Sequence, residues 1–381
     1  IPIFDCISNM KILFIATNIP TTKRKSNGVI LRIADLLSKK HELDVIFPKE
    51  IIPFWLKYKS KFKSLYNLKD YVLGNQEIEV LPYLRLPHKS NAFWGLKNLN
   101  LSRFIPRNYD VIHAHFLFPD ALIAQRISRK INRPYIVSIR YSDIALLTSI
   151  SHNSLTFQLA KSCLKEANAI HVLNKYTGEY IQKEFQTDYS VIPHGVDLPK
   201  LSKVISQNKK ITITCVAEFI PLKQIDWVIN AVKSYEGDAD IALKIIGKGS
   251  LQKKLHALKG ADSRIQFLGH MPNNEVMKIL TQSHIFAMPS IKETFGLVYL
   301  EAAATHNAII AYHKYSINGV FESEKEVLFC TGYMDFKNKL HRLIDDPVEV
   351  KKLANNALEK VQYMSWDSII QKYNHLYDSI V

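Results

Sequence analysis

The sequence is poor in cysteine, with four among 381 residues, and no two of them form a CxxC pair. Such scattered cysteines argue against a zinc ribbon or a disulfide framework, and they fit a reducing cytoplasm. Long apolar runs are also lacking: none reaches the roughly 18 residues of a membrane span, and no signal peptide is evident at the N-terminus. We therefore expect a cytoplasmic chain without a transmembrane helix.

Acidic residues are scarce, 35 against 50 Lys and Arg, so the formal net charge is +15. Residues 1–195 carry +12 of this charge and the remainder only +3. The N-terminal half is thus a cation, whose anionic partner could be nucleic acid, an acidic membrane surface or a phosphorylated acceptor. A composition that is rich in lysine throughout is the alternative explanation.

Short β-rich runs alternate with helix-length segments, which predicts doubly wound parallel sheets with ligands at the carboxyl ends of the strands. The pattern stops at a polar, lysine-rich stretch, Leu198–Lys210, and then restarts. Because the chain also exceeds the usual size of one core, we expect two α/β domains and a cleft. The expected strands are Lys11–Ala16, Leu43–Phe47, Glu77–Leu81, Asp110–Ala114, Tyr135–Ile139, Ala169–Leu173, Ser190–Ile192, Ile211–Val216, Ile241–Ile246, Ile265–Leu268, Ile285–Met288 and Ala308–Ala311.

The stretch 292–301, KETFGLVYLE, is the most informative one. Its turn, Phe295-Gly296-Leu297, runs into a helical pattern whose N-terminus suits a phosphate, and Gly296 lets the backbone approach a ligand. Glu293 and Glu301 would repel such an anion, so they need another partner, and sugar hydroxyls can donate hydrogen bonds to them. Glu301 lies among small and apolar neighbours, where an unpaired carboxylate is costly. One ligand class carries both a diphosphate and hydroxyls: a nucleotide sugar.

Further motifs follow strands of the second half. Lys223, in AEFIPLK, could neutralise a leaving diphosphate, or it is a surface lysine at a helix start. Gly247, in GKG after IALKII, has the same placement, although a tight strand-to-helix turn explains it nearly as well. The string Asp238-Ala-Asp240 matches a DxD motif, but it precedes a strand, which favours a turn.

In the first half, His113 and His115 share one face at a strand end, so they point into one cleft or one core. They lack the additional ligands of a metal site. We take His115 as the cleft residue and expect a core position for one of the two. Arg140 and Asp143 end the next strand, and they either pair with each other or line the cleft. Gly28 ends a loop with three cations at a helix start, where phosphate could bind.

Residues 53–69 interleave aromatic rings with lysines. Such a segment suits a membrane surface, single-stranded nucleic acid or an ordinary amphipathic helix with snorkelling lysines. No nucleic-acid-binding motif accompanies it. We therefore expect peripheral contact of Trp55–Lys69 with an anionic membrane, at the inner face of the cytoplasmic membrane, and no nucleic-acid partner.

Together these motifs resemble the retaining glycosyltransferases of family 4, from Met10 to the C-terminus. The segments that carry the resemblance are MKILFIATNIP, DVIHAHFLFPD, VIPHGVD, PLK, IIGKGSL, IQFLGH, the E-x7-E pair of Glu293 and Glu301, and Met364-Ser-Trp366 at the start of the last helix. The resemblance implies the GT-B fold, with two Rossmann-like domains and a cleft. Residues 1–195 would bind the acceptor, 196–362 would bind the nucleotide sugar, and a helix at about 363–381 would cross back.

The resemblance is to the teichuronic-acid and capsular polysaccharide type. It implies transfer of a sugar from a UDP- or GDP-sugar to a lipid-linked glycan of a bacterial surface polysaccharide, with retention of configuration and without a cofactor or metal. The residues would be His115 near the reacting centre; Lys223 and Phe295, Gly296 and Leu297 on the diphosphate; Glu293 on the donor sugar; Glu301 on the ribose; and Gly28, Arg140 and Gly247 also at the donor.

Three positions depart from the family pattern. Glu218 stands where a cation near PLK is common, Arg140-Tyr141 replaces a His-Gly pair, and the first glycine-rich loop is reduced to Gly28. Two alternatives therefore stay open: a UDP-sugar epimerase of the same fold, and a non-catalytic relative that binds or scaffolds a partner enzyme. The E-x7-E spacing and the HAHFLFPD segment favour the transferase over the epimerase.

Overall fold

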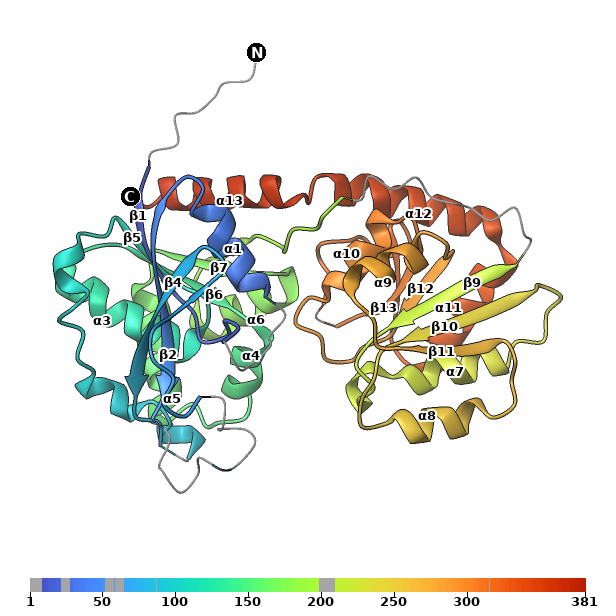
Figure 1. The fold of residues 1–381 in the computed structure, drawn as a ribbon, viewed down its shortest axis with the longest axis horizontal. Helices are drawn as coiled ribbons and strands as arrows, with labels where there is room; N and C mark the ends of the chain where they lie inside the picture. Colours follow the sequence, from blue (N-terminus) through green and yellow to red (C-terminus); the bar gives the residue numbers. More distant parts are fainter. Residues whose placement is uncertain are drawn as a thin grey trace, which may run out of the picture. The chain divides into compact units, whose positions relative to one another are not determined.

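The chain is described by a computed structural model that covers residues 9–21, 28–51, 58, 65–86, 88–198, 210–314 and 316–381. It forms two compact units, which are treated one at a time. The first comprises Ile1–Leu173, Thr177–Ile192 and Ile370–Val381, and the second comprises Asn174–Tyr176 and Pro193–Ile369. Figure 1 colours both units along the chain and shows that the last helix returns to the first unit.

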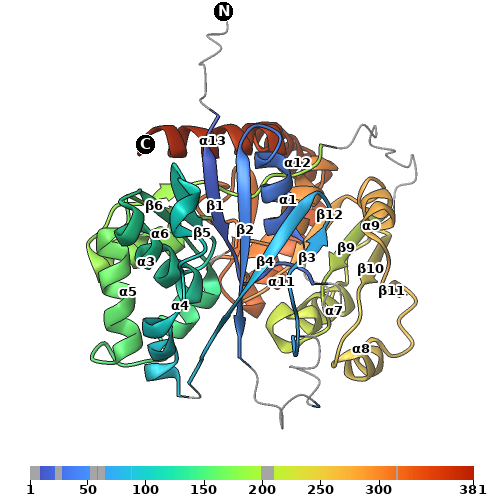
Figure 2. The same cartoon turned by 60° about the vertical axis from the view of Figure 1, so that its left-hand side comes forward.

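An eight-stranded sheet forms the centre of the first unit, in the order β3-β4-β2-β1-β5-β6-β7-β8. All neighbours are parallel except β3 and β4, and Figure 2 shows β1, β2 and β4 side by side. The inner strands are continuous apolar runs because helices cover both faces of a parallel sheet. The strands are β1 (Lys11–Ile15), β2 (Glu42–Glu50), β3 (Tyr71–Leu73), β4 (Gln76–Tyr83), β5 (Val111–Ala114), β6 (Tyr135–Ile139), β7 (Ala169–Val172) and β8 (Ser190–Val191).

Amphipathic helices complete the first unit. In α1 the apolar residues recur every three or four positions, so Val29, Ile33 and Leu37 are all buried on one face. The helices of this unit are α1 (Val29–Leu37), α3 (Leu122–Ile131), α4 (Tyr141–Leu147), α5 (Leu155–Glu166), α6 (Lys175–Phe185) and α13 (Trp366–Asp378), with short turns η2 (Lys89–Asn91), η3 (Trp94–Asn98), η4 (Ile105–Arg107) and η5 (Leu117–Ala121).

A buried chain of hydrogen bonds fixes the end of α13 to the sheet. The carbonyl of Ile192 can only accept, so Nε2 of His171 donates to it (2.8 Å) and Nδ1 of the neutral ring accepts from Ser138 (2.6 Å). The Ser138 hydroxyl in turn accepts from Nε2 of His113 (2.8 Å), and Nδ1 of His113 accepts from the Tyr377 hydroxyl (2.8 Å). Burial lowers the pKa of His171 to about 3, which matches the neutral tautomer. His113 is thus the core histidine expected of the pair.

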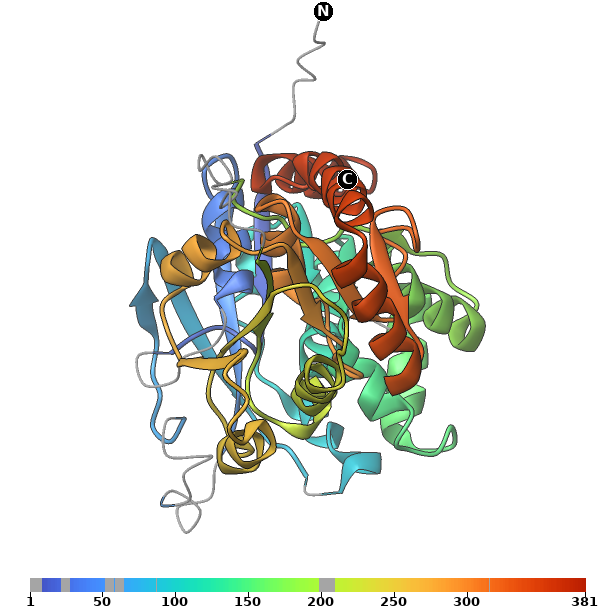
Figure 3. The same cartoon turned by 90° about the vertical axis from the view of Figure 1, so that its right-hand side faces the viewer.

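The second unit contains a six-stranded, fully parallel sheet in the order β11-β10-β9-β12-β13-β14. Its strands are β9 (Ile211–Val216), β10 (Ile241–Ile246), β11 (Ile265–Gly269), β12 (Ile285–Met288), β13 (Ala308–Tyr312) and β14 (Val327–Cys330). Its helices are α7 (Ile225–Lys233), α8 (Gln252–Lys259), α9 (Asn273–Leu280), α10 (Leu297–Ala304), α11 (Tyr333–Asp345) and α12 (Pro347–Gln362). Helices α7 and α8 pack together on one face, α10 and α12 pack on the other, and α11 adjoins α12 (Figures 1 and 3).

The expected fold class, two Rossmann-like α/β units with a last helix that returns to the first, is confirmed. That helix begins at Trp366, and every expected strand is present within a few residues. Two strands were not expected: β3, a three-residue antiparallel edge strand, and β14, a four-residue run that follows an acidic turn. Most of the expected linker, 199–209, lies outside the described residues. Within the described helices, none is long and apolar enough to cross a membrane.

Candidate functional site

The carboxyl edge of the second sheet brings together two residues that are 70 positions apart. Lys223 ends a short turn, η6 (Pro221–Lys223), and Glu293 lies in the loop after β12. Their side chains form an ion pair in which each side chain is 16% exposed. The backbone holds the two segments in place, because the Ile291 amide donates to the Leu222 carbonyl at 3.0 Å. Both charges therefore face a site that is only partly open to water.

Gly296 caps the N-terminus of α10 with a left-handed backbone, φ 81°. A Cβ at this position would lie 2.7 Å from two ring carbons of Tyr299 and 3.1 Å from Cγ of Glu293, so only glycine fits. The neighbouring Phe295 side chain is 1% exposed and packs edge-on against His194. Phe295 can therefore reach a ligand only through its backbone, whereas the amides of the first helical turn remain suited to a phosphate.

Glu301 lies one turn into α10 and has a partner that the sequence did not suggest. Asn273, the first residue of α9, donates its amide to Oε1 of Glu301 at 2.7 Å. Burial raises the pKa of Glu301, with Asp197 acting in the same direction, and the hydrogen bond from Asn273 opposes them. One carboxylate oxygen of Glu301 thus already accepts a hydrogen bond from an amide, in the helix that the Gly296 turn starts.

Gly247 is explained by packing. Its φ is 143°, and a Cβ would lie 1.9 Å from the Ala217 carbonyl oxygen, while its amide donates to the Gly269 carbonyl at 2.8 Å. The backbone of the strand-to-helix turn thus passes directly over the end of β9. This is the tight turn that was the alternative explanation of the GKG motif, and contact of Gly247 with a donor stays a prediction.

In the first unit, His115 and Arg140 are buried, in contrast to the cleft position expected for His115. The His115 side chain is 0% exposed and stacks on Phe14 with ring centroids 3.9 Å apart. Arg140, 4% exposed, donates from Nε to the His115 carbonyl at 3.4 Å. The reason is local: the His115 ring packs between the rings of Phe14 and His113, with centroids 3.9 Å and 4.0 Å away. The roles of both residues toward a donor stay predictions.

Asp143 caps the start of α4, where its carboxylate accepts the Arg140 backbone amide at 2.9 Å. Within the described residues no ion pair joins the Arg140 and Asp143 side chains; the two residues are connected by this hydrogen bond to the Arg140 backbone. Burial raises the pKa of Asp143 to about 7 although backbone hydrogen bonds and Arg140 lower it. Gly28 starts α1 with φ 67°, and the basic residues before it, 22–27, lie outside the described residues.

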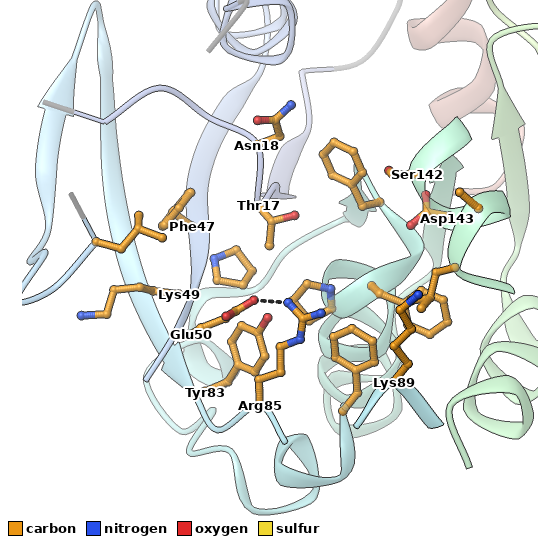
Figure 4. A pocket seen from close by; sticks show the side chains of 18 residues that line it. Thr17, Asn18, Phe47, Lys49, Glu50, Tyr83, Arg85, Lys89, Ser142 and Asp143 are labelled. Atoms are coloured by element: carbon orange, nitrogen blue, oxygen red, sulfur yellow. Dashed lines mark hydrogen bonds and ion pairs between the residues drawn. The ribbon is translucent and has the colours of Figure 1, made fainter. Parts of the chain in front are cut away.

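A cavity of about 890 Å³ opens at the carboxyl ends of β1, β2, β4 and β5 in the first unit. Figure 4 shows its polar side chains on opposite walls, with Lys49, Glu50, Tyr83 and Arg85 on one side and Ser142 and Asp143 on the other. Aromatic residues supply much of the remaining lining: Phe47, Phe93, Phe116 and Phe118. Such a position, at the strand ends of a doubly wound sheet, is where this architecture binds ligands.

The sequence did not point to Asn273 or to most of the cavity. Asn273 lies in no motif. Some cavity residues, such as Thr17, Phe118 and Asp143, lie in or beside the motifs of the first half, but Lys49, Arg85 and Lys89 come from other segments that no motif marks. Of the segment 53–69, the parts 53–57 and 59–64 lie outside the described residues. Among the residues that the structure covers, no group of three or more His, Cys, Asp or Glu is placed to hold a metal ion.

Comparison with solved structures defines the class. Sucrose-phosphate synthase from Thermosynechococcus elongatus superimposes with a TM-score of 0.73 at 15% identity, covering 97% of this chain and 99% of that one. The Anabaena protein HepE, solved in complex with UDP, has a TM-score of 0.70 at 15% identity, covering 97% and 100%. The fold is therefore that of the GT-B glycosyltransferases.

Comparison with sequence-family models identifies the family within this fold. The model "Glycosyltransferase Family 4" matches residues 27–200, and "Glycosyl transferases group 1" matches 199–360. An uncharacterized glycosyltransferase of Methanocaldococcus jannaschii is 26% identical over 80% of this chain and 86% of its own length. The putative teichuronic acid biosynthesis glycosyltransferase TuaC of Bacillus subtilis is 23% identical over 84% and 85%. The chain belongs to glycosyltransferase family 4 and is a glycosyltransferase.

Proposed function

We propose that the protein transfers a sugar from a UDP- or GDP-sugar to a glycan acceptor, with retention of configuration at the anomeric carbon. The observation that carries the proposal is the Lys223–Glu293 ion pair beside the open, glycine-capped N-terminus of α10. This arrangement offers a cation and backbone amides to a diphosphate, and a carboxylate to the hydroxyls of a sugar. A neutral ligand would leave the N-terminus of α10 without an anion.

The charges of the residues in this site suggest which part of the donor each of them would contact. In the transfer, the bond between the anomeric carbon and the diphosphate oxygen breaks and its electron pair stays on that oxygen. A bond from the anomeric carbon to the acceptor oxygen forms, and the acceptor hydroxyl passes its proton to the departing diphosphate. Negative charge grows on the departing diphosphate, where Lys223 and the first amides of α10 can stabilise it. Glu293 would then exchange its bond to Lys223 for bonds to donor hydroxyls, and Glu301, with one oxygen on Asn273, would accept from the ribose. We propose that no metal is needed.

The experiment is a panel of UDP-, GDP- and ADP-sugars, first in thermal unfolding and then in turnover. A ligand that binds the folded state alone raises its melting temperature, so the correct donor should stand out. Proton NMR of the product then reports the configuration. Inversion at the anomeric carbon would contradict the retaining mechanism, and conversion of a UDP-sugar without any acceptor would indicate the epimerase. Absence of both binding and turnover would indicate the non-catalytic relative.

We further propose a place in surface polysaccharide synthesis, on a lipid-linked glycan at the cytoplasmic face of the membrane. The support is the similarity to the teichuronic acid glycosyltransferase and the aromatic, lysine-rich segment Trp55–Lys69. Anionic liposomes should sediment the protein in a manner that salt weakens, and replacing Lys57, Lys59, Lys61 and Lys63 with Gln should reduce the bound fraction. Equal binding to neutral liposomes would contradict the membrane contact.

A further inference from the structure

The cavity of the first unit has more positive than negative side chains on its wall. Three cations line it, Lys49, Arg85 and Lys89, against two carboxylates, Glu50 and Asp143. Glu50 is already bound, because it forms an ion pair with Arg85 in the middle of the view in Figure 4. Once Arg85 and Glu50 are paired, the remaining charged side chains of the wall are Lys49, Lys89 and the carboxylate of Asp143.

Asp143 is a weak counter-ion for them. Its carboxylate accepts a backbone amide at 2.9 Å, and its side chain belongs to a residue that is 3% exposed. Burial raises the pKa of this carboxyl to about 7, so near neutral pH it spends part of its time protonated. The wall of the cavity therefore carries a net positive charge near neutral pH.

The two lysines bind only neutral oxygens in the part of the chain that the structure describes. Nζ of Lys49 donates to the Leu68 carbonyl at 3.3 Å, and Nζ of Lys89 donates to the Ser149 hydroxyl at 3.4 Å. No carboxylate among the described residues pairs with either of them. Lys49 is partly buried, and this burial lowers the pKa of its ammonium group, whereas Lys89 is exposed to water. An anion in the cavity would supply the missing charge.

The rest of the lining suits a ring that carries hydroxyls. Phe93 and Phe118 stack at 4.9 Å with an interplanar angle of 10°, and the Arg85 guanidinium lies 5.8 Å from the centre of the Phe93 ring. Thr17, Asn18 and Ser142 add short polar side chains. Phe93 and Phe118 are only 4% and 8% exposed, so they give the cavity an apolar wall and no open ring face. An apolar wall next to polar groups suits the apolar face and the hydroxyl edge of a sugar ring.

We propose that this cavity binds the acceptor, and that the acceptor is a sugar or polyol carrying a carboxylate or phosphate group, which Lys49 and Lys89 recognise. The inference rests on the proposed transfer, since it identifies the substrate that receives the sugar. It also fits the +12 charge of residues 1–195. A carboxylate on an acidic sugar and a phosphate in the head of a lipid-linked acceptor offer the same anionic chemistry, and the experiment separates them.

The test compares matched acceptors that differ in one charge. Octyl glucoside is paired with octyl glucuronide, and glucose with glucose 6-phosphate, while glucosyl dodecyl phosphate represents the lipid-linked source. Binding of each is measured by calorimetry, and transfer from the donor found in the thermal panel is measured with the same compounds. We expect the charged partner to bind about ten-fold more tightly or more, and the preference to shrink at high salt. Comparing the affinity for the glucuronide with that for the phosphate compounds then shows whether an acidic sugar or a lipid-linked phosphate is the preferred acceptor.

Three lysine variants decide the role of the cavity. In Lys49→Gln/Lys89→Gln the preference should fall to about two-fold or less, with the weak binding of the neutral partner unchanged. Lys49→Arg/Lys89→Arg should keep the preference, and Lys161→Gln/Lys165→Gln, two exposed lysines of α5, should leave it intact as a matched control for net charge. Thermal unfolding confirms that each variant is folded.

Two results would overturn the inference: no preference for the charged partner in the wild type, or equal loss of charged and neutral binding in the double Gln variant. Donor hydrolysis is recorded in the same samples. If hydrolysis persists and the charge preference is absent, the acceptor assignment alone is wrong. If hydrolysis and transfer are both absent while the charged ligand still binds, the proposed function is wrong and the anion-binding cavity stands.

Discussion

The two units have the same architecture, yet they present their functional groups differently. In the second unit, the key side chains come from two short segments, around Lys223 and around Glu293 to Glu301, and they lie at the carboxyl edge of the sheet. In the first unit, the cavity residues come from the ends of four strands, from short turns and from α4, while the motif residues His115 and Arg140 are buried.

This difference is what we expect if the second unit binds the donor and the first unit binds the acceptor, as proposed above. A diphosphate is recognised by backbone amides at a helix N-terminus, and that geometry needs one contiguous glycine-containing turn. A glycan acceptor is recognised by a surface of aromatic and charged side chains, which any segment at the sheet edge can provide. The candidate site of the second unit is therefore built around one contiguous turn, whereas the cavity of the first unit is lined by side chains from several separate segments.

The strongest test of the comparison is the removal of Glu293. We expect Glu293→Ala to lower the transfer rate by about 10²–10³-fold with little change in stability, because a preorganised charged contact to the reacting donor is lost. Lys223→Ala should act similarly, and the double variant should cost far less than the product of the two, since the residues act as a pair. Steady-state transfer and hydrolysis of the donor measure this.

A matched control is available in the same unit. Glu324 forms an exposed ion pair with Arg342 at 2.6 Å, so Glu324→Ala should leave the rate within about two-fold of the wild type. A comparable loss of rate in both variants would mean that Glu293 acts through general electrostatics of the unit and has no contact with the donor.

The two units can also be compared by how much a glycine-to-alanine substitution in each lowers the free energy of unfolding. Gly247→Ala, in the second unit, should cost about 3 kcal/mol or more, because the new Cβ would lie 1.9 Å from a backbone oxygen. Gly28→Ala, in the first unit, has no described atom within 4 Å of the new Cβ and should cost about 1 kcal/mol, the strain of its left-handed backbone. Urea unfolding measures both.

Gly332→Ala is the matched control, because this residue has an extended backbone and open space around its Cβ. We expect no measurable change in the free energy of unfolding. If Gly28→Ala is as destabilising as Gly247→Ala, the start of α1 is more tightly packed than the described residues indicate.

The cavity of the first unit should make stability depend on pH through Asp143. The pKa of this carboxyl is raised in the folded state to about 7, above the value of 3.8 expected when unfolded, so its ionised form is destabilising. The cost is present above pH 7 and disappears as the pH falls and the folded state takes up a proton. Asp143→Asn should therefore be more stable than the wild type at pH 8, and its advantage should shrink by about 1.4 kcal/mol per pH unit below 7.

Urea unfolding at pH 8, 6 and 5 follows this difference, and Asp188→Asn, at an exposed position of the same unit, is the control. A difference between wild type and Asp143→Asn that does not change with pH would show that the carboxyl titrates alike in the folded and unfolded states.

The smallest expected effect concerns metal ions. If Lys223 and the first amides of α10 stabilise the diphosphate by themselves, a chelator should leave the transfer rate unchanged. Loss of activity in the presence of EDTA, with recovery on addition of Mg²⁺ or Mn²⁺, would contradict the proposed metal-independent mechanism.

Local pattern and turn chemistry, both visible in the sequence, were sufficient to predict the two parallel sheets, the last helix from Trp366 and the glycine-capped turn before α10. Such features depend on residues that are close along the chain, where periodicity and glycine carry the signal. The same pattern placed Lys223 and the Glu293 loop after strands of one parallel sheet, whose carboxyl ends meet at one edge. Their ion pair itself was not predicted.

Only the tertiary structure determined which of the candidate site side chains are exposed and which residues they contact. It buried His115 against Phe14, placed His113 in the chain of bonds that holds α13, gave Glu301 the amide of Asn273, and gathered Lys49, Arg85 and Lys89 around one cavity. The physical reason is that burial and charge balance depend on residues brought together from tens or hundreds of positions away. The sequence by itself determined the fold and the glycine-capped turn before α10; packing determined the cavity of the first unit and its charge.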